Sequence, residues 1–336
     1  SPTTFFLGGE ENNTLVTLET ESYSVFGQID YSLTDDLVLV GGLRYTRENK
    51  DFVGNVYQNE NTDDRVIEID TSTSSLEILS QSNDQNLWSA KLQLEYSIGN
   101  SLYYAGINRG VKAGSFNAPL FGGFSFYEPE ELTSYEAGLK QSFMQGSGVF
   151  NANVFYYDYN DYQSFSWVNN AGVVTNEEAS FSGVELEVFL TPTDSLDLMV
   201  NFSYTDAVVE DLEVASGYFA DTTPPFTPEY QASAMLRYNW DAFDGNMAAQ
   251  FSANYQSETF HNARNFTAHE IDSYATADAR LTWVDGQDKW SLAAYVDNLF
   301  DSDHELIGFD VSGFYGTSQI SYAKPRTYGV TIRRSF

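Results

Sequence analysis

The chain has 336 residues, with 16 basic against 48 acidic side chains, a formal net charge of −32 and no cysteine. These numbers exclude disulfide scaffolds, thiolate metal sites and cysteine nucleophiles. They also argue against a nucleic-acid partner, because phosphate binding needs basic side chains. No apolar stretch reaches the roughly 18 residues of a membrane-spanning helix. Phe, Tyr and Trp nevertheless make up 16 % of the chain, which is unusual for a soluble acidic protein.

Apolar residues recur at every second position in many segments, which is the period of a β-strand. In chain order the pattern predicts 13 strands, at residues 22–33, 37–49, 85–97, 102–111, 132–143, 149–160, 180–190, 196–208, 228–240, 246–258, 271–284, 289–298 and 326–336. One face of each strand is apolar and the other carries charges and amides. A soluble β-sandwich or propeller alternates in the same way, so the period alone leaves that alternative open.

The connections between these strands fall into two alternating classes. Those at 34–36, 98–101, 144–148, 191–195, 241–245 and 285–288 have three to five residues, whereas those at 50–84, 112–131, 161–179, 209–227, 259–270 and 299–325 have 12 to 35. Aromatic residues such as Tyr230 and Trp240 also end the apolar stripes. Short turns on one rim, long loops on the other and aromatic girdles are typical of outer-membrane barrels. We therefore predict an all-β fold, a transmembrane antiparallel β-barrel in the outer membrane of a Gram-negative bacterium.

The end of the chain carries a separate signal. Tyr328, Val330, Ile332 and Phe336 lie on one face of the last strand, and this ending resembles the signature that the bacterial outer-membrane assembly machinery reads. The alternative is an ordinary edge strand that ends in Phe. Single-chain bacterial barrels have an even number of strands, whereas 13 is odd and residues 1–21 read as the tail of an extracellular loop. The sequence therefore predicts the C-terminal part of a larger barrel.

Seven motifs occur in order along the chain: Gly42–Arg47, Arg109–Asn117, Tyr127–Glu130 with Ser134–Lys140, Phe155–Tyr159, Gly183–Glu187, Val296–Asp301 and Pro325–Phe336. Together they resemble TonB-dependent outer-membrane receptors. The resemblance implies a plugged barrel of about 22 strands. About nine strands and the N-terminal plug domain then have no counterpart in this sequence. It further implies TonB as a partner through the plug, and a small-molecule ligand.

Two groups of residues are candidates for function. Seven charged residues alternate onto the polar face, and we expect them in the lumen, where they pair across strands or face a plug: Glu136, Lys140, Glu185, Glu187, Arg237, Asp278 and Arg280. Seven rings in or beside two long connections could capture a partly apolar ligand such as an iron chelate, or stack on sugars: Phe116, Phe121, Phe124, Tyr127, Tyr159, Tyr162 and Trp167. The alternative is that these rings pack on each other and order the loops.

The three histidines, His261, His269 and His304, lie in only two connections. They could help to recognise a metal-bearing ligand, because neutral imidazole suits transition metals, or they could simply be solvated. The acid-rich 50–84 connection could bind Ca²⁺ or bridge to lipopolysaccharide, or form only a solvated surface. We find no catalytic constellation and expect neither a cofactor nor a resident metal.

These observations predict an active transport receptor of the outer membrane rather than an enzyme. Its extracellular loops are expected to bind a scarce solute, such as an iron-siderophore complex, and its outer surface to contact lipid and lipopolysaccharide. Two alternatives remain at this point. A passive porin would close at 16–18 strands without a plug, and a surface adhesin or phage-binding barrel would keep the loops without a solute path.

Overall fold

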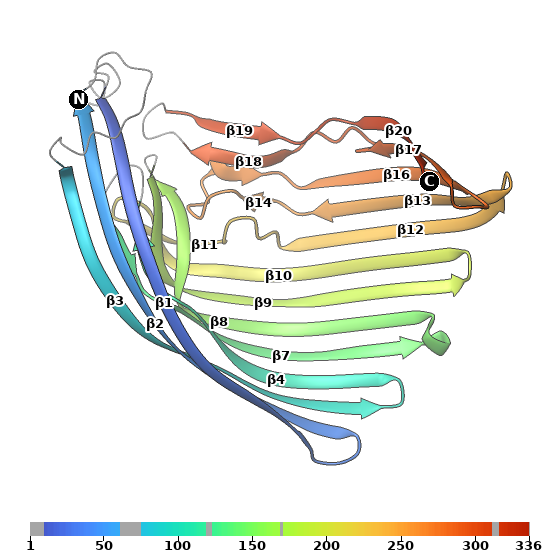
Figure 1. Cartoon of the computed structure of the whole chain (residues 1–336), viewed down its shortest axis with the longest axis horizontal. Coiled ribbons are helices and arrows are strands. Elements are labelled where there is room, and N and C mark those ends of the chain that lie inside the picture. Colours follow the sequence, from blue (N-terminus) through green and yellow to red (C-terminus); the bar gives the residue numbers. More distant parts are fainter. Residues whose placement is uncertain (1–9, 61–74, 119–122, 169–170, 311–315, 336) are drawn as a thin grey trace.

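The computed structural model describes residues 10–60, 75–118, 123–168, 171–310 and 316–335. Regular structure in these ranges is β-strand, apart from the short 3-10 helices η2 (Met144–Gly146) and η3 (Thr267–His269). No helix in the same ranges has the length and hydropathy needed to cross a membrane. Thirteen strands form one antiparallel path in which each main strand pairs with the next one along the chain (Figure 1). The predicted number and order of strands are confirmed.

The path runs through β1 (Glu10–Ser32), β2 (Leu37–Glu60), β3 (Ser75–Ile98), β4 (Ser101–Lys112), β7 (Glu130–Phe143), β8 (Gly148–Val168), β9 (Ala171–Thr193), β10 (Leu196–Ala215), β12 (Tyr230–Ala242), β13 (Gly245–Gln256), β16 (Tyr274–Asp285), β17 (Trp290–Asp297) and β20 (Thr327–Arg334). A further strand, β11 (Tyr218–Thr222), pairs with the end of β10. Three small sheets stand apart, formed by β5 (Ser115–Asn117) with β6 (Ser125–Tyr127), β14 (Thr259–Phe260) with β15 (Glu270–Ile271), and β18 (Glu305–Asp310) with β19 (Ser318–Tyr322).

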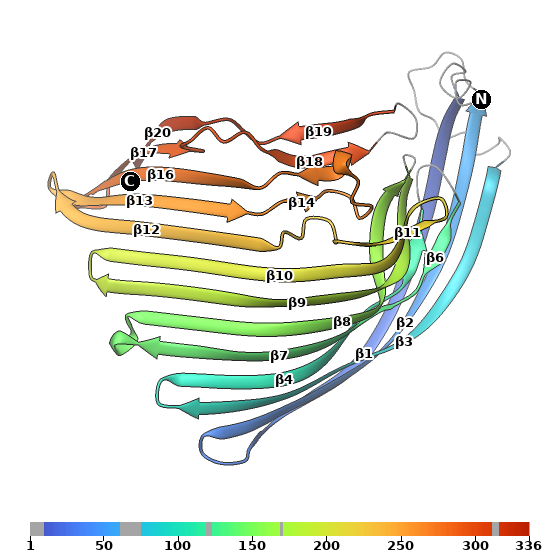
Figure 2. The ribbon, with the colours of Figure 1, turned by 180° about the vertical axis from the view of Figure 1, so that it is seen from behind.

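The two ends of the sheet differ as the sequence predicts. Tight turns join the strands at one end, here called the turn end, and long connections join them at the other, the loop end (Figures 1 and 2). At the turn end Thr34 accepts backbone hydrogen bonds from Asp36 and Leu37, and Asp285 accepts them from Lys289 and Trp290. Such side-chain to backbone bonds are the reason why Asp and Thr favour tight turns.

Several strands extend further at the loop end than predicted. The prediction that residues 1–21 form a loop tail is wrong for Glu10 onward, because β1 begins there and pairs continuously with β2, from Glu10 opposite Glu60 to Glu21 opposite Asn49. The 50–84 connection is also largely strand, since β2 continues to Glu60 and β3 begins at Ser75, on either side of residues 61–74, which lie outside the described ranges. In β1 the period of two is broken at the loop end, since Leu15 and Val16 are adjacent and Glu19 to Ser22 are all polar.

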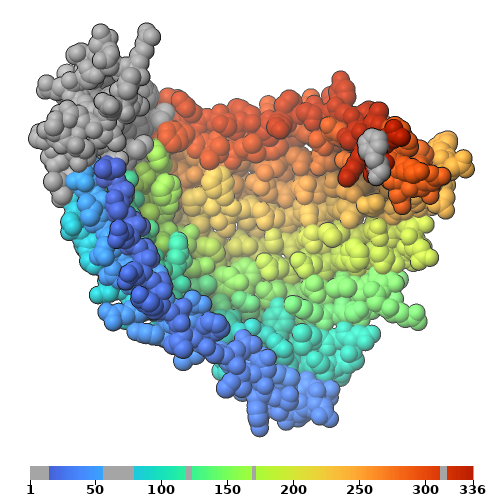
Figure 3. Space-filling view, viewed as in Figure 1, coloured from blue at the N-terminus to red at the C-terminus, as the bar shows by residue number. Residues whose placement is uncertain are grey.

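Strand register shows which residues share a face, since directly paired residues point to the same side of a sheet. Tyr135 pairs with Tyr156 and Val154 with Val184 on the apolar face, where Leu43 and Val25 also remain largely exposed. The sheet forms an incomplete wall whose margins are β1 and β20 (Figure 3). Among the described residues these two strands do not pair with each other. A total of 22 strands therefore stays a prediction.

Candidate functional site

The seven charged residues expected in the lumen do lie on one face. Lys140 pairs with Asn151, Asn151 with Glu187, and Glu187 with Asn201, so these four residues lie on the same face. Register also joins Arg237 and Arg280 through Gln250, while Asp278 and Arg280 are two residues apart on β16. Within the described ranges no ion pair joins any of the seven to another charged side chain. Amides and hydroxyls contact the carboxylates instead: Asn151 Nδ2 donates to Glu187 at 3.0 Å, and the Tyr157 hydroxyl to Glu136 at 3.3 Å. Their roles in the lumen stay a prediction.

At the loop end the same face becomes apolar, beginning with a phenylalanine cluster on β2. The Phe52 ring is only 2 % exposed. It stacks on Phe116 with 4.7 Å between ring centroids and meets the edge of Phe124 at 5.4 Å. Phe116 in turn contacts Phe126 at 5.2 Å. Phe52, Phe116, Phe124 and Phe126 form the Phe52 cluster, which packs the β5–β6 hairpin against β2.

Polar contacts anchor the same hairpin to β2 and β3. Gln85 accepts a hydrogen bond from the Gly114 N–H at 2.8 Å and donates one to the Gly114 carbonyl at 3.0 Å. Lys50 Nζ donates to the same carbonyl at 2.7 Å and pairs with Glu48 at 3.0 Å. A Cβ on Gly114 would overlap the Tyr127 carbonyl, so only glycine allows this close approach.

These contacts bear on the four ring candidates of the 112–131 connection. Phe116 is buried and Phe124 contacts Phe52, so the geometry favours the packing alternative for these two rings. Tyr127 is half-buried beside Gly114. Phe121 lies outside the described residues. Ligand binding by any of them stays a prediction.

A second apolar cluster covers β8, β9 and β10. Tyr159 and Tyr162 contact each other and Phe181, and they pack around the buried residues Ala179, Val209, Leu212 and Ala263. Irregular register between Tyr159 and Tyr162 brings both rings to this cluster. Burial, with the nearby Glu130 carboxylate, raises the pKa of Tyr162 to about 12, so its phenol stays protonated at neutral pH. Two predicted ligand-binding rings are therefore part of a small core.

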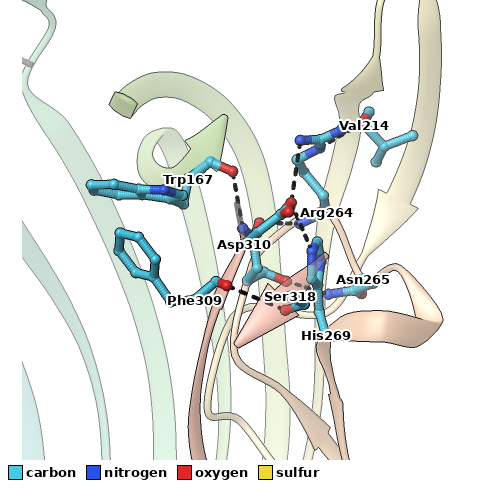
Figure 4. Close-up of polar contacts among 9 residues, drawn as sticks. Trp167, Val214, Arg264, Asn265, His269, Phe309, Asp310 and Ser318 are labelled. Atoms are coloured by element: carbon cyan, nitrogen blue, oxygen red, sulfur yellow. Dashed lines mark hydrogen bonds and ion pairs between the residues drawn. The ribbon is translucent and has the colours of Figure 1, made fainter. Parts of the chain in front are cut away.

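A buried polar group joins three connections next to this core (Figure 4). His269 Nε2 lies 3.0 Å from Asp310 Oδ2, and both side chains are almost completely buried. Arg264 approaches the same carboxylate oxygen at 3.9 Å and donates from Nε to the Val214 carbonyl at 2.6 Å. Desolvation lowers the pKa of His269 although Asp310 opposes the shift. Since desolvation outweighs the carboxylate, His269 is neutral at neutral pH.

The structure brings two of the three histidines together. The His261 and His269 rings are 5.0 Å apart, and desolvation also lowers the pKa of His261. Gly308 faces the His261 ring so closely that any Cβ there would overlap it. His304 instead stacks on Tyr274 at 3.9 Å. In the described part of the chain no three potential metal ligands form a group. The hypothesis that the histidines recognise a metal-bearing ligand stays untested.

Further contacts tie the long connections into one layer. Trp167 of the β8–β9 hairpin packs on Phe309 of β18 at 4.6 Å, and its carbonyl accepts a hydrogen bond from Asn262 at 3.1 Å. Asn117 of β5 donates to the Gly172 carbonyl at 3.0 Å. We call the described parts of the connections 112–131, 161–179, 209–227, 259–270 and 299–325 the loop-end layer. Contacts among them, rather than one long loop, hold the layer on the sheet.

Below the layer, the polar face of β9, β10, β12, β13 and β16 forms an open hollow of about 400 Å³. Carboxylates, amides and hydroxyls line it, including Glu185, Glu187, Asn201, Gln231, Asn254 and Tyr274. Of these residues, only the two glutamates are apparent as candidates from the sequence. The amides are not, because only pairing across five strands brings them together.

Comparison with known proteins agrees with this architecture. The family model described as TonB dependent receptor-like, beta-barrel matches residues 2–299. The chain belongs to this family. It is a family of transport receptors of the outer membrane, so the resemblance seen in the seven motifs is confirmed.

Solved structures with the same fold include three receptors. The ferric yersiniabactin uptake receptor FyuA from Yersinia pestis has a TM-score of 0.79 at 19 % identity, over 97 % of this chain and 47 % of that one. The ferric-catecholate import receptor Fiu from E. coli K12, in its closed form, has a TM-score of 0.71 at 18 % identity, over 96 % of this chain and 45 % of that one. The siderophore receptor PiuA from Acinetobacter baumannii has a TM-score of 0.70 at 16 % identity, over 95 % of this chain and 44 % of that one. The chain thus spans less than half the length of these receptors.

The last strand of this TonB-dependent receptor barrel keeps the predicted pattern. Tyr328, Val330 and Ile332 pair with Val296, Ala294 and Leu292 on the apolar face, and all three are largely exposed. Arg334, on the same face, lies over the Trp290 ring at 5.1 Å. Phe336 lies outside the described residues. Recognition of this ending by the assembly machinery stays a prediction.

Proposed function

We propose that the protein captures a scarce small solute at its loop end and takes part in importing it across the outer membrane with energy supplied through TonB. The observation that carries the proposal is the loop-end layer, which stands over the polar face of a wall from the TonB-dependent receptor family. The family consists of transport receptors, and no catalytic role is proposed.

The proposed solute is an iron-siderophore-type complex. Support comes from the names of the similar receptors, which refer to ferric yersiniabactin, ferric catecholates and siderophores. Because the sequence identities are below 20 %, the particular ligand of this chain has to be inferred from the residues of this chain. The exposed or half-buried groups around the layer, such as Tyr127 and Trp167, are the proposed contacts, whereas the Phe52 cluster is proposed to hold the layer in shape.

The remaining partners follow from the proposed location. The exposed apolar face is proposed to contact outer-membrane lipid, and the acidic outer connections to contact lipopolysaccharide through divalent cations. The terminal strand is proposed to engage the outer-membrane assembly machinery. Coupling to TonB is proposed for the receptor as a whole, since the chain spans less than half the length of the similar receptors.

Uptake by whole cells tests the proposal. Cells that express the protein are given a panel of radiolabelled iron chelates, cobalamin and glycans, in strains with and without TonB. We expect saturable uptake of an iron chelate that is lost without TonB. Uptake that is unsaturable and independent of TonB would indicate a porin, and surface binding without uptake would indicate an adhesin.

A further inference from the structure

One sector of the wall lacks positive charge altogether. Residues 141–236, which cover β8, β9, β10 and half of β12, contain no lysine or arginine but 14 acidic residues. Elsewhere on the polar face cations are present, for example Arg44, Lys50 and Lys140 on β2 and β7, which share that face with Gly42, Phe52 and Glu136. The net charge of the chain is therefore unevenly distributed around the wall.

The hollow of about 400 Å³ begins in this sector, on β9, β10 and the first half of β12, and continues onto β13 and β16. Glu185 and Glu187 are both exposed there, two residues apart on β9. Asn151 donates one hydrogen bond to Glu187, and Asn153 approaches Glu185 at 3.5 Å. Each carboxylate has about four lone-pair sites, so both keep acceptors for a ligand.

The other groups around the hollow are amides and hydroxyls in short ladders. Asn201 donates to Ser233 at 3.0 Å, and the Tyr274 hydroxyl donates to Gln256 at 3.0 Å. Each amide offers two donors and one acceptor, and these bonds use only part of that capacity. The carboxylates and amide oxygens of the hollow can therefore accept hydrogen bonds from O–H, N–H and ammonium groups, and no lysine or arginine lines the hollow to neutralise an anion.

We propose that this hollow selects cargo by charge, admitting chelates of zero or positive net charge that carry O–H or N–H donors and disfavouring anionic chelates. The inference rests on the import function proposed above and assigns the class of its substrate. Like charges placed together across a binding surface reduce affinity and suppress wrong partners. Hydroxamate chelates of iron(III) are neutral or, with a free amine, cationic, whereas tris-catecholate chelates are anionic. The hollow fits the first class.

Competition binding on cells that express the protein tests the order of affinity. The probes are a neutral and a cationic ferric tris-hydroxamate and a trianionic ferric tris-catecholate, measured at low and high salt. We expect the cationic chelate to bind most tightly and to lose the most affinity in high salt, because salt screens charges. Tightest binding of the catecholate overturns the inference while leaving the import function intact.

Charge-neutral variants locate the effect. In the double variant Glu185→Gln and Glu187→Gln we expect affinity for the cationic chelate to fall about tenfold or more, as for the loss of a charge-assisted contact, with the neutral chelate changed by less than about twofold. Equal loss for both chelates would mean that the glutamates only hold the structure, and it would overturn charge selection. The matched control is Asp194→Asn, an exposed carboxylate in the turn that follows the same strand, outside the loop-end layer, which should change neither affinity.

If cells take up none of the chelates, the proposed import of iron chelates fails. The charge preference of the hollow is then read from the purified protein with spermidine and citrate as probes. Binding of spermidine that weakens in the double variant supports the inference, and binding of citrate in preference to spermidine overturns it.

Discussion

The side chains at the loop end and those in the middle of the polar face are held in place in different ways. In the middle, Glu185 and Glu187 stay exposed, and their described contacts are single hydrogen bonds to neighbouring strands. At the loop end, Phe52 and His269 are almost completely buried by connections distant in sequence. The middle therefore depends on register alone, whereas the loop end depends on tertiary contacts.

This difference indicates where substitutions should act. Side chains in the middle are supported by the backbone ladder and can change with little effect on folding. Side chains in the loop-end layer hold its shape, so their loss should disturb the layer before the sheet.

The largest effect is expected from Phe52→Ala. Removing a buried phenylalanine costs about 3–5 kcal/mol, and here the β5–β6 hairpin would lose the ring that contacts Phe116 and Phe124. We expect faster hydrogen exchange of the amides in β5 and β6 in detergent-solubilised protein. The control is Val53→Ala on the opposite, exposed face of β2, which should leave the exchange unchanged. Equal exchange in both variants would contradict a structural role for the cluster.

A smaller but clear effect is expected from Asp310→Ala. The change removes the partner of His269 and Arg264, and breaking a buried charged contact costs about 3 kcal/mol. Limited proteolysis should then cut the 259–270 and 299–325 connections faster. Asp303→Ala, at an exposed position of the same connection, is the control. Protection that survives in Asp310→Ala would show that apolar contacts such as Trp167 on Phe309 suffice.

Acid should loosen the same region. Folding lowers the pKa values of His261 and His269 below the ordinary value of 6.5, so below that pH the opened layer binds more protons than the closed one. The stability from these histidines is complete above pH 6.5 and is lost as pH falls through their folded pKa values. Hydrogen exchange of residues 259–271 between pH 7.5 and pH 5 measures this loss, after correction for intrinsic exchange rates. A His269→Gln variant should depend less on pH.

The smallest effect is expected from Asp84→Asn. Asp84 pairs with Arg47 at 3.6 Å, and both side chains are more than half exposed. Solvent screens such pairs, so the unfolding free energy should change by less than about 1 kcal/mol. Thermal unfolding in detergent checks this value. A larger loss would mean that exposed charges contribute to the loop end as much as its buried contacts do.

Much of the fold could be predicted from local pattern. Alternation, loop lengths and turn residues predicted the number of strands, the sorting of connections and the shared face of Glu136, Lys140 and Glu187. The strand bounds at the loop end could not be predicted, since the adjacent Leu15 and Val16 break the alternation and Glu19 to Ser22 are all polar. The candidate site was even harder to predict from the sequence. Tyr162 and Phe116 have the composition of ligand-binding rings, and only their packing on Tyr159 and Phe52 reveals their part in small cores.

The sequence by itself determined the sheet, its two faces and the family, because strand period, turn chemistry and motif order act over a few residues at a time. The sequence also shows that lysine and arginine are absent from residues 141–236. Only the tertiary structure decided what these features do together. His269 and Asp310 are 41 residues apart in sequence, and the amides of the hollow come from several strands. Contacts over such separations depend on the register of the whole wall, which no local pattern specifies.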